Sequence, residues 1–218
     1  MSDVARPFFT LLGYRTLFRR ARLAAMINRM EDKSVIDVCC GEGGIIARLA
    51  EYDRTKIGGL DIFRPSLDKA MRLDVYRGLV QGNALFLPFK DKCTDIAVSI
   101  AALEHLSKED GIRLVEEMTR IARKVVVVSC PVVRWEQDPL DGNPYQKHLY
   151  HWTIPELKEM GFQDMVGVGL RGMSGRIWGS LLRTYVSPVL GLMTLLATVI
   201  SYRIPRIAAN VVAWKVCE

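Results

Sequence analysis

The segment VIDVCCGEGG, from Val35 to Gly44, joins a short apolar run to three glycines within four residues. The β-branched run at its start is typical of a buried strand. Ile45 then begins a helical pattern that continues through 46–50. A strand, a glycine turn and a helix in this order bind nucleotide-like ligands at the carboxyl edge of a parallel sheet. Glycine suits this turn because it lets the backbone approach a ligand and adopts a positive φ.

The spacing of the glycines argues against a dinucleotide. A dinucleotide fingerprint needs a third glycine where this chain has Ile46. Asp37 stands before the turn, and a carboxylate there suits a cationic amino group and repels a pyrophosphate. The segment resembles the first motif of class I S-adenosylmethionine-dependent methyltransferases. Asp37, Gly41 and Gly43 match that motif, and Cys39 replaces its first glycine.

Three later segments carry the same resemblance. Asp61 lies near the end of the second predicted strand, 18 residues after Gly43, close to the spacing of about 20 expected for a residue that binds ribose hydroxyls. The run from Gly82 to Phe89 is similar to the family's G-D-A-x-x-L-P-F segment, with Asn83 in place of aspartate. An asparagine oxygen can still accept a hydrogen bond from an adenine amino group. Leu103-Glu104-His105 follows the fourth predicted strand, as in the family.

The resemblance implies a set of cofactor-binding residues. Asp61 would bind the ribose, Ile62 would pack on the adenine, and Asn83 would bind the adenine amino group. The full set implied for S-adenosylmethionine is Asp37, Cys39, Gly41, Gly43, Asp61, Ile62, Asn83, Ala84 and Ile100.

The acceptor side is predicted from a second segment. Residues 148–162 resemble the family's H-x-x-x-W-T-x-x-E-L-x-x-x-G-F run, with a capping box at Thr153. Loops on this edge often cover the substrate, so the predicted substrate residues are Tyr145, His148 and Trp152. His105 and His148 are predicted proton acceptors; the alternative for His148 is that it holds the loop by hydrogen bonds. The sulfonium already activates the methyl group, so no metal and no metal ligand is predicted.

Two other classes of methyltransferase are excluded by what the chain carries after its fourth and fifth predicted strands. Base amino-methyltransferases have an Asn/Asp-Pro-Pro-aromatic run where this chain has 101–104. Cytosine C5 enzymes use a nucleophilic cysteine, usually in a Pro-Cys pair, whereas Cys130 precedes Pro131 here. Cys130 is therefore interpreted as a core thiol.

Composition sets broader limits. The 218 residues suit one domain with a sizeable core, so 1–218 is predicted to be a single methyltransferase domain. The five cysteines form no C-x-x-C pair, and no signal peptide is evident, which favours reduced thiols in a cytoplasmic protein. The net charge of +6 is compatible with anionic partners but does not select one.

Two segments flank this pattern. Residues 1–33 are predicted to form basic amphipathic helices, which pack either on the sheet or on an anionic membrane surface. Residues 171–208 form an apolar insertion, and 184–202 contain no charge. Its apolar helix of about 14 residues is too short for a hydrocarbon core of about 30 Å, and a closing strand follows it. The insertion is expected to bury its apolar face in the protein, in a second subunit through 176–206, or in the membrane interface.

The predicted fold is α/β: a Rossmann-like, seven-stranded mixed sheet with the last strand antiparallel, helices on both faces and the apolar insertion before the last strand. Strands are predicted at 35–38, 56–62, 78–81, 95–100, 124–130, 162–170 and 209–216. The predicted function is methyl transfer from S-adenosylmethionine to a small or lipophilic acceptor, with peripheral membrane association as an option. RNA methylation, motivated by the charge, and a non-catalytic S-adenosylmethionine-binding protein, motivated by Cys39, are the alternatives; nucleic acid is the less favoured partner.

Overall fold

The computed structural model describes residues 34–48, 57–134, 136–139, 142–170, 200 and 204–217. The predicted N-terminal helices (1–33) and most of the insertion (171–208) lie outside these residues, as does the end of the helix predicted after the glycine turn. Within the described ranges, no helix is long and apolar enough to cross a membrane. That residues 1–218 form a single domain stays a prediction.

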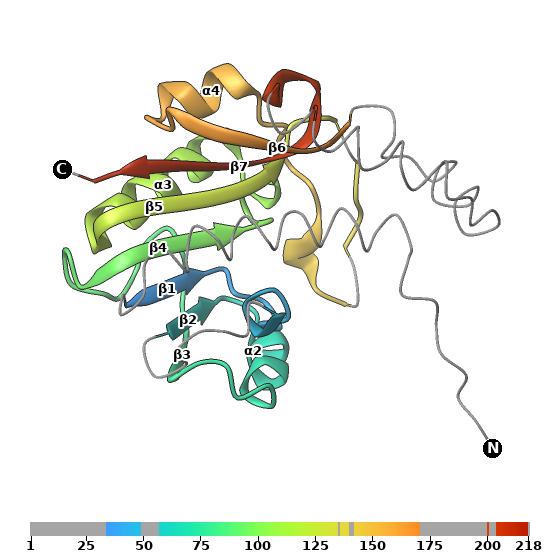
Figure 1. Cartoon of the computed structure of the whole chain (residues 1–218). Helices are drawn as coiled ribbons and strands as arrows, with labels where there is room; N and C mark the ends of the chain where they lie inside the picture. Colours follow the sequence, from blue (N-terminus) through green and yellow to red (C-terminus); the bar gives the residue numbers. More distant parts are fainter. Residues whose placement is uncertain are drawn as a thin grey trace.

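The chain forms a seven-stranded sheet in the order β3-β2-β1-β4-β5-β7-β6 (Figure 1). The strands are β1 (Val35–Val38), β2 (Ile57–Asp61), β3 (Gly78–Gln81), β4 (Thr94–Ile100), β5 (Ala122–Pro131), β6 (Asp164–Leu170) and β7 (Ala208–Val216). The helices are α2 (Arg64–Met71), α3 (Lys108–Ile121) and α4 (Ile154–Glu159), with 3-10 turns η1 (Ile46–Arg48), η3 (Leu103–His105), η4 (Pro144–Gln146) and η5 (Pro205–Ile207).

The strand directions are those that the sequence predicts. The five strands β1 to β5 are mutually parallel, whereas β7 runs antiparallel to both of its neighbours, β5 and β6. The chain order reverses between β1 and β4, because β2 and β3 lie on one side of β1 and the later strands on the other. Ligands of open α/β sheets bind outside the carboxyl ends of the strands at such a reversal. The predicted Rossmann-like mixed sheet is confirmed.

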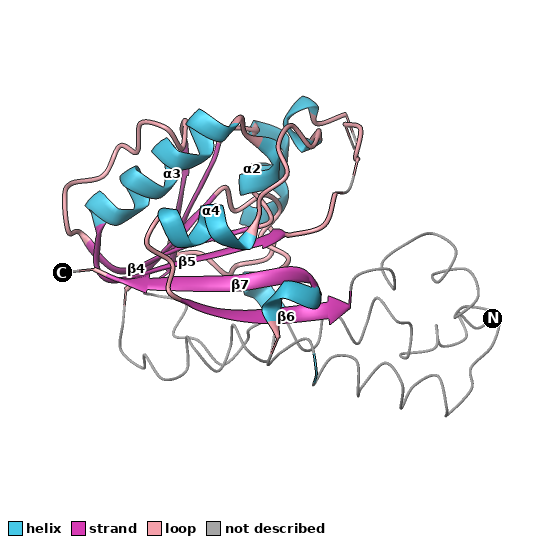
Figure 2. Ribbon diagram, turned by 90° about the horizontal axis from the view of Figure 1, so that it is seen from above, coloured by secondary structure: helices cyan, strands magenta, loops and turns pink. Residues whose placement is uncertain are grey.

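Two apolar clusters hold the layers together. Helices α3 and α4 lie together on one face of the sheet (Figure 2), where Leu114, Met118 and Leu157 are buried against β4, β5 and β7. On the opposite face, Ile46 of η1 and the ring of Tyr76 pack against strand residues such as Val98. Residues on both faces of the central strands are buried, which explains their nearly continuous apolar sequences.

The described helices begin where the sequence indicates. Ser107 caps α3 by accepting a hydrogen bond from the Asp110 amide. Thr153 and Glu156 form the predicted capping box of α4, in which each side chain bonds the other residue's amide. Pro65 lies in the first turn of α2, where its missing N–H costs nothing.

Candidate active site at the carboxyl edge of the sheet

The turn after β1 is left-handed at three positions. Cys39, Gly41 and Gly43 have φ angles of 60°, 55° and 74°. A left-handed conformation costs a residue with a Cβ about 1–2 kcal/mol, so Cys39 is strained where the family motif has glycine. Cys39 nevertheless adopts the left-handed conformation, so the turn keeps a positive φ at this position without glycine. At Gly43 a Cβ would lie 2.8 Å from the Tyr76 ring, so this position also requires glycine for space.

Asp61, at the end of β2, joins the turn to the next loop. One carboxylate oxygen accepts from the Gly41 amide and the other from the Phe63 amide, each at 2.8 Å. The side chain is 8% exposed. Each carboxylate oxygen can accept more than one hydrogen bond, so Asp61 retains acceptor capacity beyond these two amides. The predicted ribose ligand is therefore also the residue that fixes the glycine turn against β2.

Asp37 is buried beneath the same turn. Its carboxylate is 3% exposed and accepts a 2.7 Å hydrogen bond from the Tyr76 hydroxyl. Burial raises the pKa of Asp37 to about 7, with the Tyr76 hydrogen bond opposing and the charge of Asp61 adding to the rise. In this position Asp37 supports the turn from inside the protein. Its contact with a cationic amino group stays a prediction.

The loop after β3 carries the predicted adenine-binding residues. The Asn83 side-chain oxygen accepts from the Leu85 amide at 2.9 Å, which shapes the loop at this point. Ala84 is buried and Ile62, across the edge, is 37% exposed. Arg120 of α3 donates to the carbonyl groups of Leu87 and Phe89 and so anchors the loop to the helix. The sequence pattern does not indicate this role of Arg120.

A second group of polar side chains follows β4. Ala101 has a left-handed φ of 56°, and η3 then brings Glu104 and His105 to the carboxyl edge. The His105 and His148 rings lie edge to face with centroids 4.9 Å apart. Burial lowers the pKa of His105, with the Lys147 carbonyl opposing and His148 adding to the fall, so His105 is neutral near pH 7. The two predicted proton acceptors are therefore neighbours.

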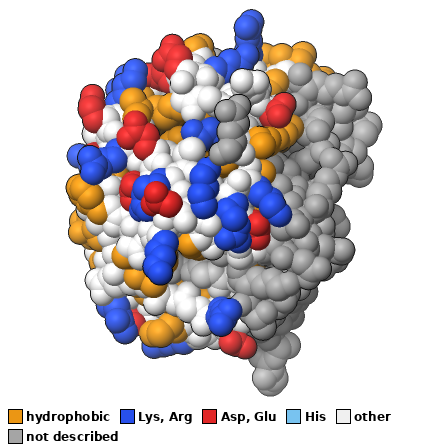
Figure 3. Space-filling view, turned by 90° about the vertical axis from the view of Figure 1, so that its left-hand side faces the viewer, with side chains coloured by type: hydrophobic (Ala, Val, Ile, Leu, Met, Phe, Trp, Pro, Cys, Tyr) orange, Lys and Arg blue, Asp and Glu red, His pale blue; other side chains and the backbone are white. Residues whose placement is uncertain are grey.

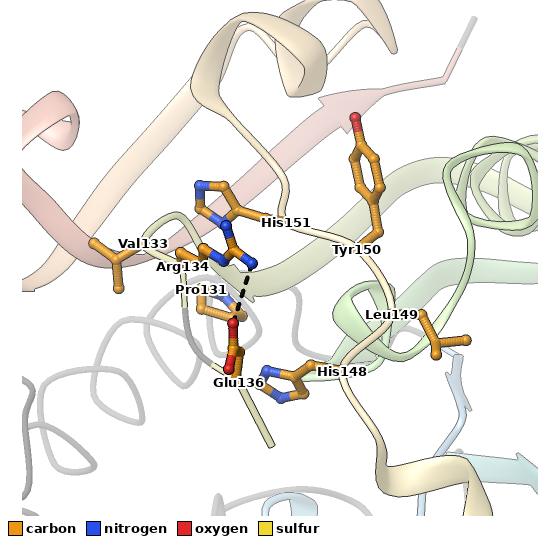
Figure 4. A pocket seen from close by; sticks show the side chains of 8 residues that line it. All are labelled: Pro131, Val133, Arg134, Glu136, His148, Leu149, Tyr150 and His151. Atoms are coloured by element: carbon orange, nitrogen blue, oxygen red, sulfur yellow. Dashed lines mark hydrogen bonds and ion pairs between the residues drawn. The ribbon is translucent and has the colours of Figure 1, made fainter. Parts of the chain in front are cut away.

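A cavity of about 310 Å³ opens beside His148 (Figure 4). It lies at the end of β5 and is lined by Pro131, Val133, Arg134, Glu136, His148, Leu149, Tyr150 and His151. Arg134 and Glu136, both from the segment that follows β5, form an ion pair of 3.1 Å at its wall. The cavity combines apolar walls with charged and imidazole groups, which suits a small polar molecule with an apolar part.

The other two predicted substrate residues lie in different environments. Tyr145 is 51% exposed, and its ring centroid lies 6.4 Å from that of Phe63, which follows Asp61. The segment that carries the predicted substrate residues therefore approaches the loop after β2, next to the predicted cofactor residue Asp61. Trp152 is 1% exposed and donates its indole N–H to the Leu103 carbonyl. It packs in the core behind η3, so its side chain supports the site from within.

The opposite edge of the sheet carries charges of both signs. Asp95, at the start of β4, pairs with Arg123 and Lys124, and Asp91 pairs with Arg120. Lys and Arg side chains are interspersed with Asp and Glu on the face where these amino ends lie (Figure 3). The positive charge of the chain is therefore mixed with negative charge on this face.

Comparison with known proteins gives one family match. Residues 35–124 match a family described as a methyltransferase domain. The sterol 24-C-methyltransferase erg-4 of Neurospora crassa is 32% identical over 96 residues, and the ajmaline N-methyltransferase of Rauvolfia serpentina is 30% identical over 96 residues. Each match covers 41% of this chain but 25% and 32% of those two proteins. The chain thus matches a quarter to a third of the length of these curated relatives.

Solved structures with the same fold cover most of the chain. The [4+2]-cyclase SpnF has a TM-score of 0.60 at 18% identity and covers 90% of this chain and 82% of its own. An S-adenosylmethionine-dependent methyltransferase of Thermotoga maritima has a TM-score of 0.58 at 16% identity, and the match covers 94% of this chain and 91% of that protein. The magnesium protoporphyrin IX methyltransferase of Synechocystis PCC 6803 was solved with bound SAH. It has a TM-score of 0.58 at 11% identity, and the match covers 100% of this chain and 90% of that protein.

Proposed function

We propose that this chain, which carries a methyltransferase domain with the class I fold, transfers a methyl group from S-adenosylmethionine to a small-molecule acceptor. The family match covers the strands and turns that hold the predicted cofactor residues. The observation that carries the proposal is the link between Asp61 and the Gly41 amide. It brings an acidic side chain with remaining acceptor capacity to a left-handed glycine turn, at the strand reversal where nucleoside ligands bind.

The chemistry that this site must supply is mainly orientation. The sulfonium of S-adenosylmethionine is already a good leaving group, so the protein must hold a nucleophile in line with the methyl carbon. The acceptor loses a proton as it is methylated. The His105 ring lies against the ring of His148, which lines the cavity, and imidazoles so placed are suitable proton acceptors.

We further propose that the acceptor is lipophilic. The curated relatives are named for a sterol and for alkaloids, which are small and largely apolar molecules. Peripheral contact with a membrane through 176–206, or a homodimer through the same segment, is proposed from its apolar sequence. Sedimentation with anionic liposomes tests the membrane contact, and analytical ultracentrifugation tests the dimer.

Calorimetry with S-adenosylmethionine tests the cofactor site. Asp61→Ala should weaken binding by about 10- to 100-fold, because it removes a charge-assisted hydrogen bond worth roughly 1.5–3 kcal/mol. Asp68→Ala is the matched control, since Asp68 is an exposed carboxylate of α2 paired with Arg64. Equal affinity in wild type and Asp61→Ala would remove Asp61 from the site. Undetectable binding to the wild type would overturn the proposed function.

The acceptor can be found with a labelled methyl group. The protein is incubated with cell extract and methyl-labelled S-adenosylmethionine, and the extract is then separated into lipid, small-molecule, RNA and protein fractions. Label in the lipid or small-molecule fraction is expected. Label confined to RNA would favour the alternative function instead, and binding without any transfer would favour a non-catalytic protein.

A further inference from the structure

Glu104, His105 and His148 have the composition and spacing of a metal site. One ligand atom from each of the three side chains lies within 4.8 Å of the other two. Glu104 is 4% exposed, and the two histidines are half-buried. Two imidazoles and one carboxylate are a donor set that binds divalent first-row transition metals and leaves coordination positions open. An arrangement of this kind is more specific than a group of exposed acidic residues.

Backbone hydrogen bonds hold the cluster in place. The Leu149 amide donates to the Glu104 carbonyl at 2.8 Å, which ties the segment carrying His148 directly to η3. The His148 amide donates to the Gln137 carbonyl at 3.0 Å. The three side chains are therefore brought together by fixed backbone and not only by their own contacts, so little entropy is lost when they bind a common ion.

His105 is oriented as metal-binding histidines usually are. Its Nδ1 lies 3.1 Å from the Lys147 carbonyl oxygen. A carbonyl oxygen can only accept, so Nδ1 carries the proton and Nε2 keeps the lone pair in the neutral ring. A histidine that binds a metal typically donates its other ring N–H to a carbonyl or carboxylate in this way.

We propose that Glu104, His105 and His148 bind a divalent transition-metal cation such as Zn²⁺, whose open positions face the cavity beside His148 and take an oxygen of the methyl acceptor. The metal site stands independently of the proposed methyl transfer. The inferred class of acceptor, in contrast, rests on the proposed methyl transfer. The cavity, with its ion pair and apolar wall, supplies the space for such a molecule.

This arrangement selects an acceptor with a hydroxyl or enol group. A bound cation lowers the pKa of a coordinated O–H group, so the proton passes to solvent and the oxygen retains its electron pair. That pair forms the new bond to the methyl carbon, while the carbon–sulfur bond breaks and its electrons return to sulfur to give the neutral thioether. The two imidazoles then act as metal ligands, in place of the role of proton acceptor.

Metal titration of the chelator-treated protein tests the site directly. Calorimetry with Zn²⁺ should show saturable binding of one ion, and Co²⁺ should give the visible absorption bands of a coordinated ion. His148→Ala should weaken Zn²⁺ binding by about 10-fold or more. His151→Ala is the matched control, because His151 lines the same cavity but lies outside the cluster. Circular dichroism and thermal unfolding of each variant show whether it is folded.

Each outcome bears on the proposal. Absence of saturable Zn²⁺ binding by the wild type, or equal affinities of wild type and a folded His105→Ala/His148→Ala variant, would leave a hydrogen-bonded cluster without a metal. Catechol added to the Co²⁺-loaded protein should shift the visible bands; unchanged bands would overturn the oxygen-acceptor part. S-Adenosylmethionine affinity is measured separately on the metal-free protein. Zn²⁺ binding without S-adenosylmethionine binding would therefore refute the proposed function and leave the metal site standing.

Discussion

Replacing Asp37 by Asn should flatten the pH dependence of the free energy of unfolding between about pH 4 and pH 7. Burial raises the pKa of Asp37 from 3.8 to about 7, so the native state binds more protons than the unfolded state in this range. Stability therefore falls as pH rises through the range and levels off above it. Three pKa units correspond to about 4 kcal/mol, which is the largest contribution expected. An Asn side chain stays neutral and still accepts from the Tyr76 hydroxyl.

Urea unfolding of wild type and Asp37→Asn at intervals from pH 4.5 to pH 8 measures this contribution. The variant should gain stability over the wild type as pH rises, by up to a few kcal/mol at pH 8. Asp95→Asn should behave oppositely: burial alone would raise its pKa, but Arg123 and Ser34 hold it well below the ordinary range. It should therefore lose stability at neutral pH. If the curves of wild type and Asp37→Asn differ by a constant at every pH, the buried carboxylate does not titrate as described.

Two glycine substitutions give further predictions. Gly111→Ala should destabilise the protein by roughly 1–3 kcal/mol in urea unfolding, because a Cβ would lie 2.3 Å from the Trp152 ring, and this outweighs the helix propensity of about 1 kcal/mol that alanine adds. Gly78→Ala, where nothing lies within 4 Å, should change stability by less than about 0.5 kcal/mol, and an equal loss in both would contradict the steric argument. Gly43→Ala should cost about 2 kcal/mol or more in thermal unfolding, since it combines a left-handed φ with a contact to Tyr76; a neutral effect would show that the turn is not rigid.

The elements of the fold were predictable because their signals are local. The run 124–130 is continuous and β-branched, and it forms the centre of β5. The predicted third strand, 78–81, coincides with β3, and the capping box at Thr153 begins α4 as expected. Boundaries moved by one or two residues, as at Ala122, where the predicted helix gives way to strand.

The contacts of the site were not predictable to the same degree. The bond between Asp37 and Tyr76 joins residues 39 positions apart, and no local pattern around Tyr76 indicates it. A carboxylate within an apolar strand does indicate that a buried partner must exist, but not which residue it is. The meeting of His105 with His148 depends on the backbone link between Glu104 and Leu149. Sequence similarity predicts a role for each histidine but does not predict that the two rings are in contact.

The position of β7 between β5 and β6 has a consequence for biosynthesis. Among the strands that the structure describes, β6 pairs with β7 alone, so it cannot join the sheet until Ala208–Val216 has been synthesised. The nascent chain can assemble β1 to β5 on the ribosome, but the exposed edge of β5 must wait for a segment made much later. Ribosome-bound fragments that stop before residue 208 should therefore be protease-sensitive around β6, whereas the released chain that includes Ala208–Val216 should be protected there.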